Sequence, residues 1–380
     1  MAFTFGDIIG QQAVVEQLKR SVDENRLAHA LLITGPRGNG KLAIAVALAH
    51  YLLCGNRHGG DACGTCPACV KMNKLIHSDL HFVFPVKRKK SGGSDSAPVS
   101  DDYIAEWREL LIKNPYFSYD DWLQKLDLDN QQPMIYERES GEILQKLSMK
   151  SREGGWKIVI IWLPEKMKDV GANKLLKIIE EPPQETLFLL VSEEPSQIIS
   201  TILSRTQRVE VPRIMQQDIA DALVARHGLT PADAAHVAQQ SGGSWEAAEE
   251  MLSLDGDKAL YLDLFSQLMR IAYARNIQEM RRWSEQVAAM GRERQKRLLA
   301  YCQRMIRENF IMNFKRDEMI CLSPEERNFS VRFSPFVNER NIFGIMEELS
   351  EAQRHIEQNV NAKMVFFDMS LRMIVWIKNR

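Results

Sequence analysis

A phosphate-binding loop constrains the fold of this chain more than any other feature. Residues 35–41 read Gly-Pro-Arg-Gly-Asn-Gly-Lys and match the pattern G-x-x-x-x-G-K. An apolar run at 30–34 precedes the loop, and an alanine-rich run at 42–53 follows it. A buried strand, a glycine-rich turn and a helix in this order begin a parallel α/β unit whose backbone N–H groups close around phosphate. The predicted phosphate-binding residues are Gly35, Gly38, Gly40 and Lys41.

Apolar patterning predicts how the rest of the chain is organised. Further strands are expected at 157–163, 187–192 and 207–211, with helices between them, one of which covers 173–180 and ends before two prolines. After residue 211 the strand signals fade and apolar residues recur at helical spacing. Thr230 and Pro231 are typical of a helix start, and Gly228 is typical of the end of the preceding helix. We therefore expect an α/β domain at 1–211, a small helical domain at 212–252 and a larger helical domain at 253–380.

Two parts of an ATP-hydrolysing site are missing. The residue after Lys41 normally carries a hydroxyl that holds Mg²⁺, and here it is Leu42. A second strand normally ends in acidic residues that hold Mg²⁺ and activate water, but the strand at 157–161 continues into Trp162 and Leu163. Glu165 lies beyond these positions and is expected to be a surface carboxylate. The sequence predicts no hydrolysis and leaves ATP binding open.

Four of the six cysteines form a compact group. Cys54, Cys63, Cys66 and Cys69 have the spacing C-x8-C-x2-C-x2-C, and four thiolates complete a closed, structural Zn²⁺ site. An iron–sulfur cluster is a weaker interpretation, because the ferredoxin pattern needs a further cysteine four residues on, before proline. Four free buried thiols are improbable at this density.

Composition limits the possible partners. The formal net charge of −1 gives no overall attraction to nucleic acid. A basic run at 87–90 opens a segment at about 86–133 that is interpreted as an insertion with a surface loop and some helix at 103–113. The sequence contains no run of about 18 apolar residues and no visible signal peptide, so we expect a cytoplasmic protein without a membrane segment.

Several stretches together resemble the delta-prime family of bacterial DNA polymerase III clamp-loader subunits, AAA+ proteins related to replication factor C. The similar stretches are 7–11, 26–30, the segment Asn-Lys-Leu-Leu-Lys-Ile-Ile-Glu-Glu-Pro-Pro at 173–183, Ser204-Arg205-Thr206 in place of Ser-Arg-Cys, 241–248 and 359–363. Glu246 stands where active members carry a nucleotide-sensing arginine. The resemblance is best over 5–85 and 135–250.

The resemblance implies an AAA+ P-loop domain with a zinc module at 54–69, a helical lid and a helical collar that joins a ring of subunits. It implies that the chain does not hydrolyse ATP and that Arg205 reaches, as an arginine finger, into the ATP site of a neighbouring gamma/tau subunit. The implied partners are the gamma/tau and delta subunits in a hetero-oligomer, which meets the sliding clamp and primed DNA during replication.

Two other functions compete with this prediction. An active gamma/tau-like ATPase would need a hydroxyl residue at 42 and acidic residues at 162 and 163. A zinc-dependent DNA-binding protein would use the basic run at 87–90, but it is weakened by the near-zero net charge.

Overall fold

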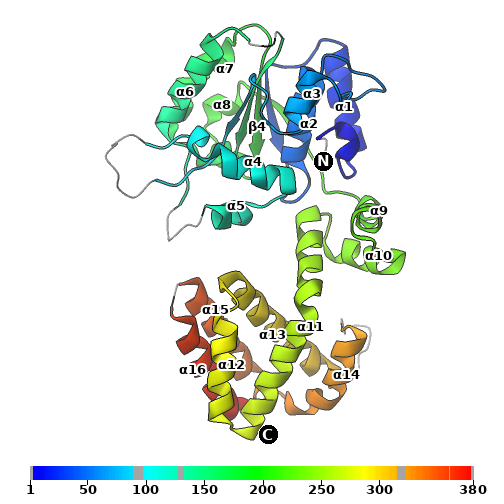
Figure 1. Ribbon diagram of the computed structural model, residues 1–380, viewed down its shortest axis with the longest axis vertical. Coiled ribbons are helices and arrows are strands. Elements are labelled where there is room, and N and C mark those ends of the chain that lie inside the picture. Colours follow the sequence, from blue (N-terminus) through cyan, green and yellow to red (C-terminus); the bar gives the residue numbers. More distant parts are fainter. Residues whose placement is uncertain are drawn as a thin grey trace. The chain divides into compact units, whose positions relative to one another are not determined.

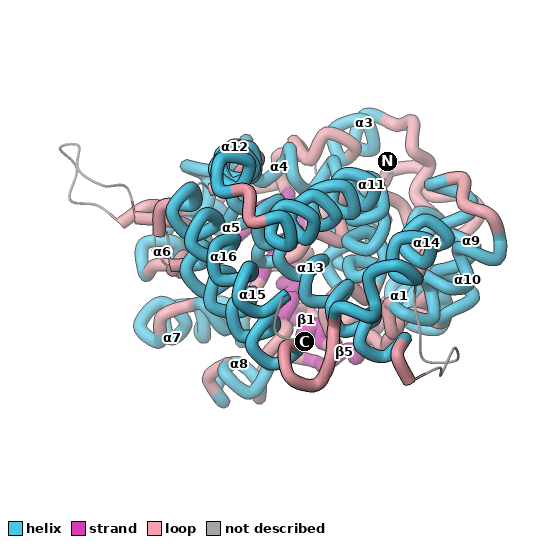
Figure 2. Tube along the Cα trace, turned by 90° about the horizontal axis from the view of Figure 1, so that it is seen from below, coloured by secondary structure: helices cyan, strands magenta, loops and turns pink. Residues whose placement is uncertain are grey.

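The computed structural model of the chain describes residues 3–88, 97–126, 132–151, 153, 155–314, 322–358 and 360–377, with the backbone alone at 253–258, 293 and 324. The described residues form two compact units, Met1–Met251 and Leu252–Arg380. Every strand of the described part falls between Ala30 and Glu210, in the first unit. Figure 2 draws the strands in magenta among the helices. No described helix is both long enough and apolar enough to cross a bilayer.

The first unit is built on one parallel sheet of five strands in the order β2-β3-β4-β1-β5. The strands are β1 (Ala30–Thr34), β2 (Leu80–Val83), β3 (Lys157–Trp162), β4 (Thr186–Ser192) and β5 (Gln207–Glu210). Four of them confirm the predicted strands to within about one residue at each end. The sequence analysis missed β2, because four residues are too few for a periodic signal.

Helices cover both faces of this sheet (Figure 1). Alternate residues of β1 point to opposite sides: Leu31 and Ile33 join one core, whereas Ala30 and Leu32 join another. The first core contains residues of α1 (Gln12–Asp23), α2 (Lys41–Leu53), α3 (Pro67–Met72), α4 (Ile104–Lys113) and α5 (Tyr119–Lys125). The second contains residues of α6 (Glu137–Ser148), α7 (Asp169–Glu180) and α8 (Ser200–Leu203). The predicted α/β fold, with a parallel sheet and a phosphate-binding loop between β1 and α2, is confirmed.

Much of the predicted insertion belongs to the first core. The helix expected at 103–113 is present as α4, and its Trp107 is fully buried, with its ring stacked 4.2 Å from that of Phe84. Trp122 of α5 packs edge-on against Trp107. Residues 97–126 therefore complete the sheet's covering layer, which the sequence pattern did not indicate. Residues 89–96 and 127–131, including part of the basic run, lie outside the described residues.

In the residues described after β5, the regular elements are all helices. α9 (Gln216–His227) ends at Gly228, which has φ 67°, and the side chain of Thr230 accepts a hydrogen bond from Asp233 N to cap α10 (Pro231–Gln240). Both predicted helix boundaries are confirmed. α11 (Trp245–Ala274) contains the boundary between the two units. The division into lid and collar domains stays a prediction.

The second unit is helical. Besides the end of α11 it holds α12 (Ile277–Ala288), α13 (Arg292–Met312), α14 (Pro324–Phe333), the 3-10 turn η6 (Ser334–Phe336), α15 (Ile342–Glu357) and α16 (Ala362–Ile377). One apolar core connects these elements, with Phe265, Leu298 and Phe366 fully buried.

Candidate nucleotide, arginine and metal sites

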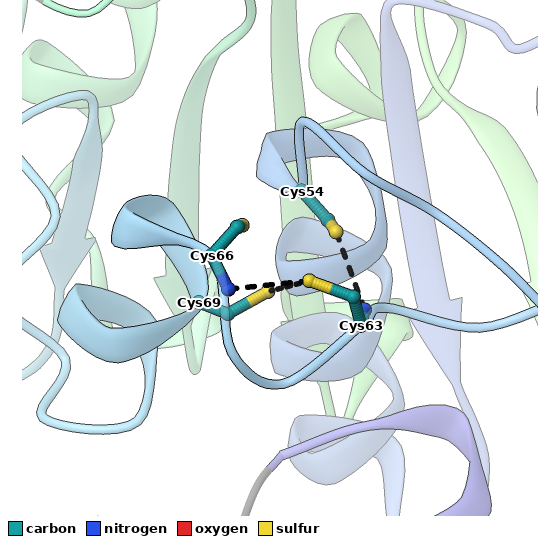
Figure 3. Close-up of side chains that lie close together, drawn as sticks. All are labelled: Cys54, Cys63, Cys66 and Cys69. Atoms are coloured by element: carbon teal, nitrogen blue, oxygen red, sulfur yellow. Dashed lines mark hydrogen bonds between the residues drawn. The ribbon is translucent and has the colours of Figure 1, made fainter.

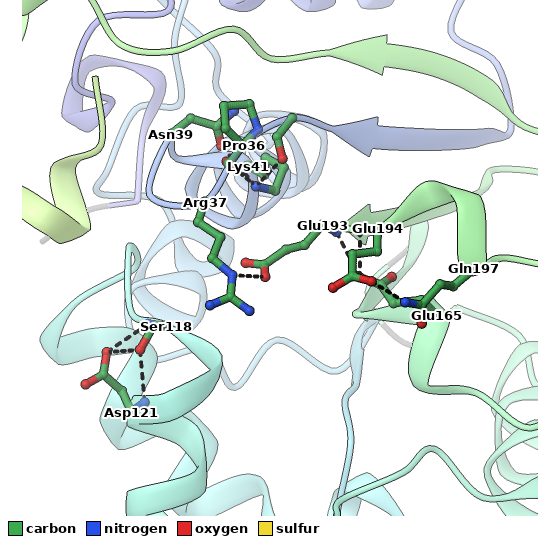
Figure 4. A network of polar contacts seen from close by, with 11 residues as sticks. Pro36, Arg37, Asn39, Lys41, Ser118, Asp121, Glu165, Glu193, Glu194 and Gln197 are labelled. Carbon is green, nitrogen blue, oxygen red and sulfur yellow. Dashed lines mark hydrogen bonds and ion pairs between the residues drawn. The ribbon is translucent and has the colours of Figure 1, made fainter. Parts of the chain in front are cut away.

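The lysine of the phosphate-binding loop forms hydrogen bonds with the loop itself. The ammonium of Lys41, at the start of α2, donates to Gly35 O at 2.9 Å, Pro36 O at 2.6 Å and Asn39 Oδ1 at 3.2 Å (Figure 4). These three contacts match the three protons of a lysine ammonium. Burial lowers the pKa of Lys41 to about 8, against the opposing effect of Glu193. The group that would hold the β- and γ-phosphates is therefore held by its own loop.

Neighbouring residues also pack tightly against the loop. Gly38 has φ 69°, and a Cβ at this position would lie 2.0 Å from Ser244 Oγ. The backbone N–H of Trp245, at the start of α11, donates to Gly38 O at 2.9 Å. A Cβ on Gly40 would lie 2.8 Å from the ring of Tyr116. Glycines at these positions ordinarily leave room for phosphate, whereas here Ser244, Trp245 and Tyr116 pack closely against them.

Carboxylates surround this loop. Arg37 pairs with Glu193 at 2.9 Å, and Glu165 Oε1 accepts the backbone N–H groups of Glu193 and Glu194 at 2.9 and 3.2 Å (Figure 4). The sequence predicts a surface carboxylate at Glu165; in the structure this residue is half-buried, and its hydrogen bonds join η3 (Pro164–Lys166) to the residues that follow β4. Burial, followed by the charge of Glu193, raises the pKa of Glu246 to about 7.

The positions expected to hold Mg²⁺ are packed with apolar groups. Trp162 is 4% exposed, and its ring lies 5.1 Å from each of the Trp107 and Phe117 rings. Leu163 and Leu42 are also buried. Hydrocarbon side chains offer no ligand to a hard cation, which binds through oxygen.

Arg205 lies at the opposite edge of the sheet from the phosphate-binding loop. The loop follows Thr34 at the carboxyl end of β1, whereas Arg205 precedes β5, which runs parallel to β1 with Leu31 opposite Gln207. Its Nε donates to Glu180 Oε2 at 2.9 Å and its Nη1 donates to Thr201 O at 3.1 Å. The Arg205 side chain remains 33% exposed. Arg205 thus lies at the end of the strands opposite the loop of its own chain and is bonded to Glu180, the last residue of α7.

The four cysteines gather around one point, as predicted. Cys54 caps the end of α2, Cys66 caps the start of α3, Cys69 lies in α3, and Cys63 lies in the loop between them (Figure 3). The four sulfur atoms all lie within 4.8 Å of one another, and Cys63 Sγ is 3.7 Å from Cys69 Sγ. Zn–S bonds of about 2.3 Å in a tetrahedron place sulfurs about 3.8 Å apart, so this geometry fits zinc.

The surroundings of the sulfurs also suit a cation. The backbone N–H groups of Thr65 and Cys66 lower the pKa of Cys63 to about 6, whereas burial raises the pKa of Cys69. A bound cation would hold all four as thiolates. His58 forms a backbone bridge with Asp61 and is not part of the group.

Asp61 connects this module to the N-terminal segment. Its carboxylate accepts the backbone N–H groups of Phe5 and Gly6 at 3.2 and 2.8 Å. Sequence patterns gave no sign of Asp61 or of Tyr116, whose hydroxyl accepts the Ile9 N–H at 2.9 Å. Both contacts join residues more than 50 positions apart, and single-sequence periodicity carries no signal for such pairs.

Comparison with known proteins identifies the family of this chain. A family model described as "DNA polymerase III, delta subunit" matches residues 10–215, more than half of the chain. The chain belongs to this family. Escherichia coli DNA polymerase III subunit delta' is 30% identical over 190 residues, which are 50% of this chain and 44% of that protein. The predicted resemblance to delta-prime subunits is confirmed.

More distant similarities extend to a second kind of subunit. Mycobacterium bovis DNA polymerase III subunit gamma/tau is 27% identical over 247 residues, 63% of this chain and 35% of that protein. The chain thus spans less than half the length of these relatives. A solved structure of a gamma subunit-related protein from Thermotoga maritima covers 96% of this chain and 99% of its own, with 15% identity and a TM-score of 0.39.

Proposed function

We propose that the chain is a non-hydrolysing delta-prime-type subunit of a DNA polymerase III clamp loader, which helps to load the sliding clamp onto primed DNA. Its partners would be gamma/tau and delta subunits in a hetero-oligomer, and the clamp and DNA would be met through that complex. Membership of the DNA polymerase III delta family and the similarity to delta' proteins support this role.

One observation carries the non-hydrolysing part of the proposal: Trp162 is sealed in an aromatic core where a hydrolysing site needs a carboxylate. Leu42 removes the hydroxyl ligand, and the Lys41 ammonium is already satisfied by three acceptors of its own loop. Without a bound Mg²⁺ and an activated water, the site would lack the groups that hydrolysis of the γ-phosphate requires.

Arg205 would act on a neighbouring subunit's nucleotide. A guanidinium that enters an ATP site from another chain stabilises negative charge as the γ-phosphate transfers. The Glu180 carboxylate and the Thr201 carbonyl hold Arg205 through Nε and Nη1. Such a fixed guanidinium loses little conformational freedom when it meets a phosphate.

The test is the ATPase rate of a reconstituted loader with clamp and primed DNA, together with that of the isolated chain. The isolated chain is expected to be inactive. Arg205→Ala should lower hydrolysis at the neighbouring site by about 10³-fold or more, while the complex still assembles. Arg281→Ala, a change at a 76% exposed arginine in the second unit, is the control and should have no effect. Normal ATPase and clamp loading with Arg205→Ala would refute the arginine-finger role.

A gamma/tau-like ATPase is the second candidate. It is favoured by the gamma/tau similarity. In the described residues, moreover, the buried Oγ of Ser192 at the end of β4 has no hydrogen-bond partner. ATP hydrolysis by the isolated chain that disappears with Lys41→Ala would establish this function in place of the first.

We also propose that the four cysteines hold one structural Zn²⁺. Four protein thiolates would fill its tetrahedral shell and leave no position for water, so the ion would stabilise the module and take no part in chemistry. It would join the end of α2 to α3 across a loop that contributes little core of its own.

A further inference from the structure

An aromatic groove lies in the second unit, between α11 and α14. Its volume is about 490 Å³, and every residue that lines it belongs to this unit. We call it the α11–α14 groove; its walls are formed by Ser266, Met269, Arg270, Tyr273, Asn328, Phe329, Arg332, Phe333, Phe336 and Ile377. The proposed role of the chain uses none of these residues.

The apolar wall follows from helical spacing. Phe329 and Phe333 are four residues apart on α14 and stack with ring centroids 5.2 Å apart, and the next ring, Phe336 of η6, lies 6.2 Å from Phe333. Tyr273 of α11 closes the row edge-on at 5.4 Å from Phe336 and is 49% exposed. The result is a continuous aromatic surface that is only partly covered.

The charged residues that line the groove are both arginines. Arg270 on α11 and Arg332 on α14 are exposed, and the lining contains no Asp or Glu. Over the residues that the structure describes, neither guanidinium has a hydrogen-bonding or carboxylate partner. By contrast, Arg304 and Arg372 of the same unit pair with Glu326 and Glu348. Two unpaired guanidiniums beside an apolar groove create a site for an anion attached to an apolar group.

We propose that the α11–α14 groove binds a short peptide segment of a partner protein, in which a large apolar side chain is flanked by carboxylates. The apolar side chain would lie against the Phe333 and Phe336 rings, and the carboxylates would pair with Arg270 and Arg332.

A single-stranded nucleic acid is the other anionic ligand to consider. Such strands stack successive bases on free aromatic faces. Phe329, Phe333 and Phe336 instead stack on one another, and Tyr273 packs edge-on against Phe336. The groove therefore favours the peptide.

Binding of a defined probe to the full chain tests the proposal. The probe is a fluorescein-labelled hexapeptide, Gly-Asp-Phe-Asp-Leu-Gly, followed by fluorescence polarisation, with a matched peptide that carries Asn in place of both Asp residues. We expect the acidic peptide to bind, and the Asn peptide to bind about tenfold more weakly. Arg270→Gln and Arg332→Gln should each weaken binding by about five- to tenfold. Rising salt should weaken it as well.

The control variant is Arg327→Gln, which changes an exposed arginine of the same helix outside the lining and should leave binding unchanged. All three changes are at exposed positions, so circular dichroism should show unchanged folding. Absence of binding up to about 1 mM peptide, or binding that is the same in Arg270→Gln and Arg332→Gln, would overturn the proposal. A labelled dT12 oligonucleotide that binds with the same arginine dependence and displaces the peptide would overturn it too, and would make the groove a nucleic-acid site.

Discussion

At the scale of single residues, the charge around the phosphate-binding loop depends on where two side chains lie, those of Lys41 and Glu246. Lys41 is turned inward onto carbonyls, and Glu246 faces the loop from the first turn of α11. A protonated Glu246 is favoured by its buried setting next to Glu193.

The raised pKa of Glu246 predicts a pH-dependent stability. Its pKa rises from 4.5 to about 7 on folding, so the contribution of this group is fully present below about pH 4.5 and is lost as the pH rises through 7. Glu246→Gln should therefore stabilise the fold at pH 8 by about 1 kcal/mol, a figure reduced for solvent access to a partly exposed group. At pH 4.5 it should change little. Thermal unfolding at both pH values measures the difference.

A matched control is Glu16→Gln, a change at an exposed glutamate on α1. An equal gain at both pH values, or the same gain from the control, would show that the Glu246 carboxylate is not the origin of the effect.

At the scale of elements, the third strand ends in a packed aromatic cluster. Trp162 touches rings from α4 and from the segment before α5, so this strand end is part of the main core. Trp162→Asp, the change that would restore one acidic position, should cost about 4 kcal/mol or more, since it leaves a cavity and an unpaired buried charge. It should lower the unfolding temperature markedly and give no ATPase activity.

Ile112→Asp on α4 is the control, because this side chain is 39% exposed and should tolerate the charge. A stable Trp162→Asp variant with ATPase activity would show that the aromatic cluster is a replaceable filling and that the hydrolytic site is latent.

Sequence patterns predicted those elements whose information is local. The strand before the loop, Ala30–Thr34, the cap at Thr230 and the cysteine group each depend on residues close together in the chain. The four-residue strand Leu80–Val83 and the aromatic packing of Trp107 on Trp162 were not predicted. Such features arise from contacts between distant segments, for which spacing alone carries no signal.

The same contrast holds for the candidate sites. Motifs in the sequence singled out Arg205 and Glu246 as residues of interest. Their neighbours, Glu180 beside Arg205 and Gly38 beside Glu246, became visible only in the structure. The sequence also could not indicate that Lys41 is held by its own loop, since that depends on side-chain direction.

At the scale of the whole molecule, the cysteine module should behave as a local clamp. Metal analysis of the purified chain should give one zinc per molecule, and Cys66→Ser should remove it. Loss of zinc should then increase backbone hydrogen exchange at 54–73 and, through the Asp61 contacts, at Phe5 and Gly6. Exchange in the core of the second unit, which holds no cysteine of this group, should not change.

Cys302→Ser is the control, because this buried thiol belongs to the second unit and is not part of the group. Full zinc content in Cys66→Ser, or exchange at Phe5 and Gly6 that does not respond to chelation, would contradict the clamp.

The aromatic cluster around Trp162 has an evolutionary consequence. An ancestor with acidic residues at this strand end could lose them one at a time once hydrolysis was no longer selected. To return to acidic residues, the chain would have to place a charged side chain in a core that Trp107 and Phe117 already fill. Such a change would strongly destabilise the fold. Under the proposed function, this packing makes the loss of hydrolysis hard to reverse, because selection for a folded core alone opposes the return of acidic residues to this strand end.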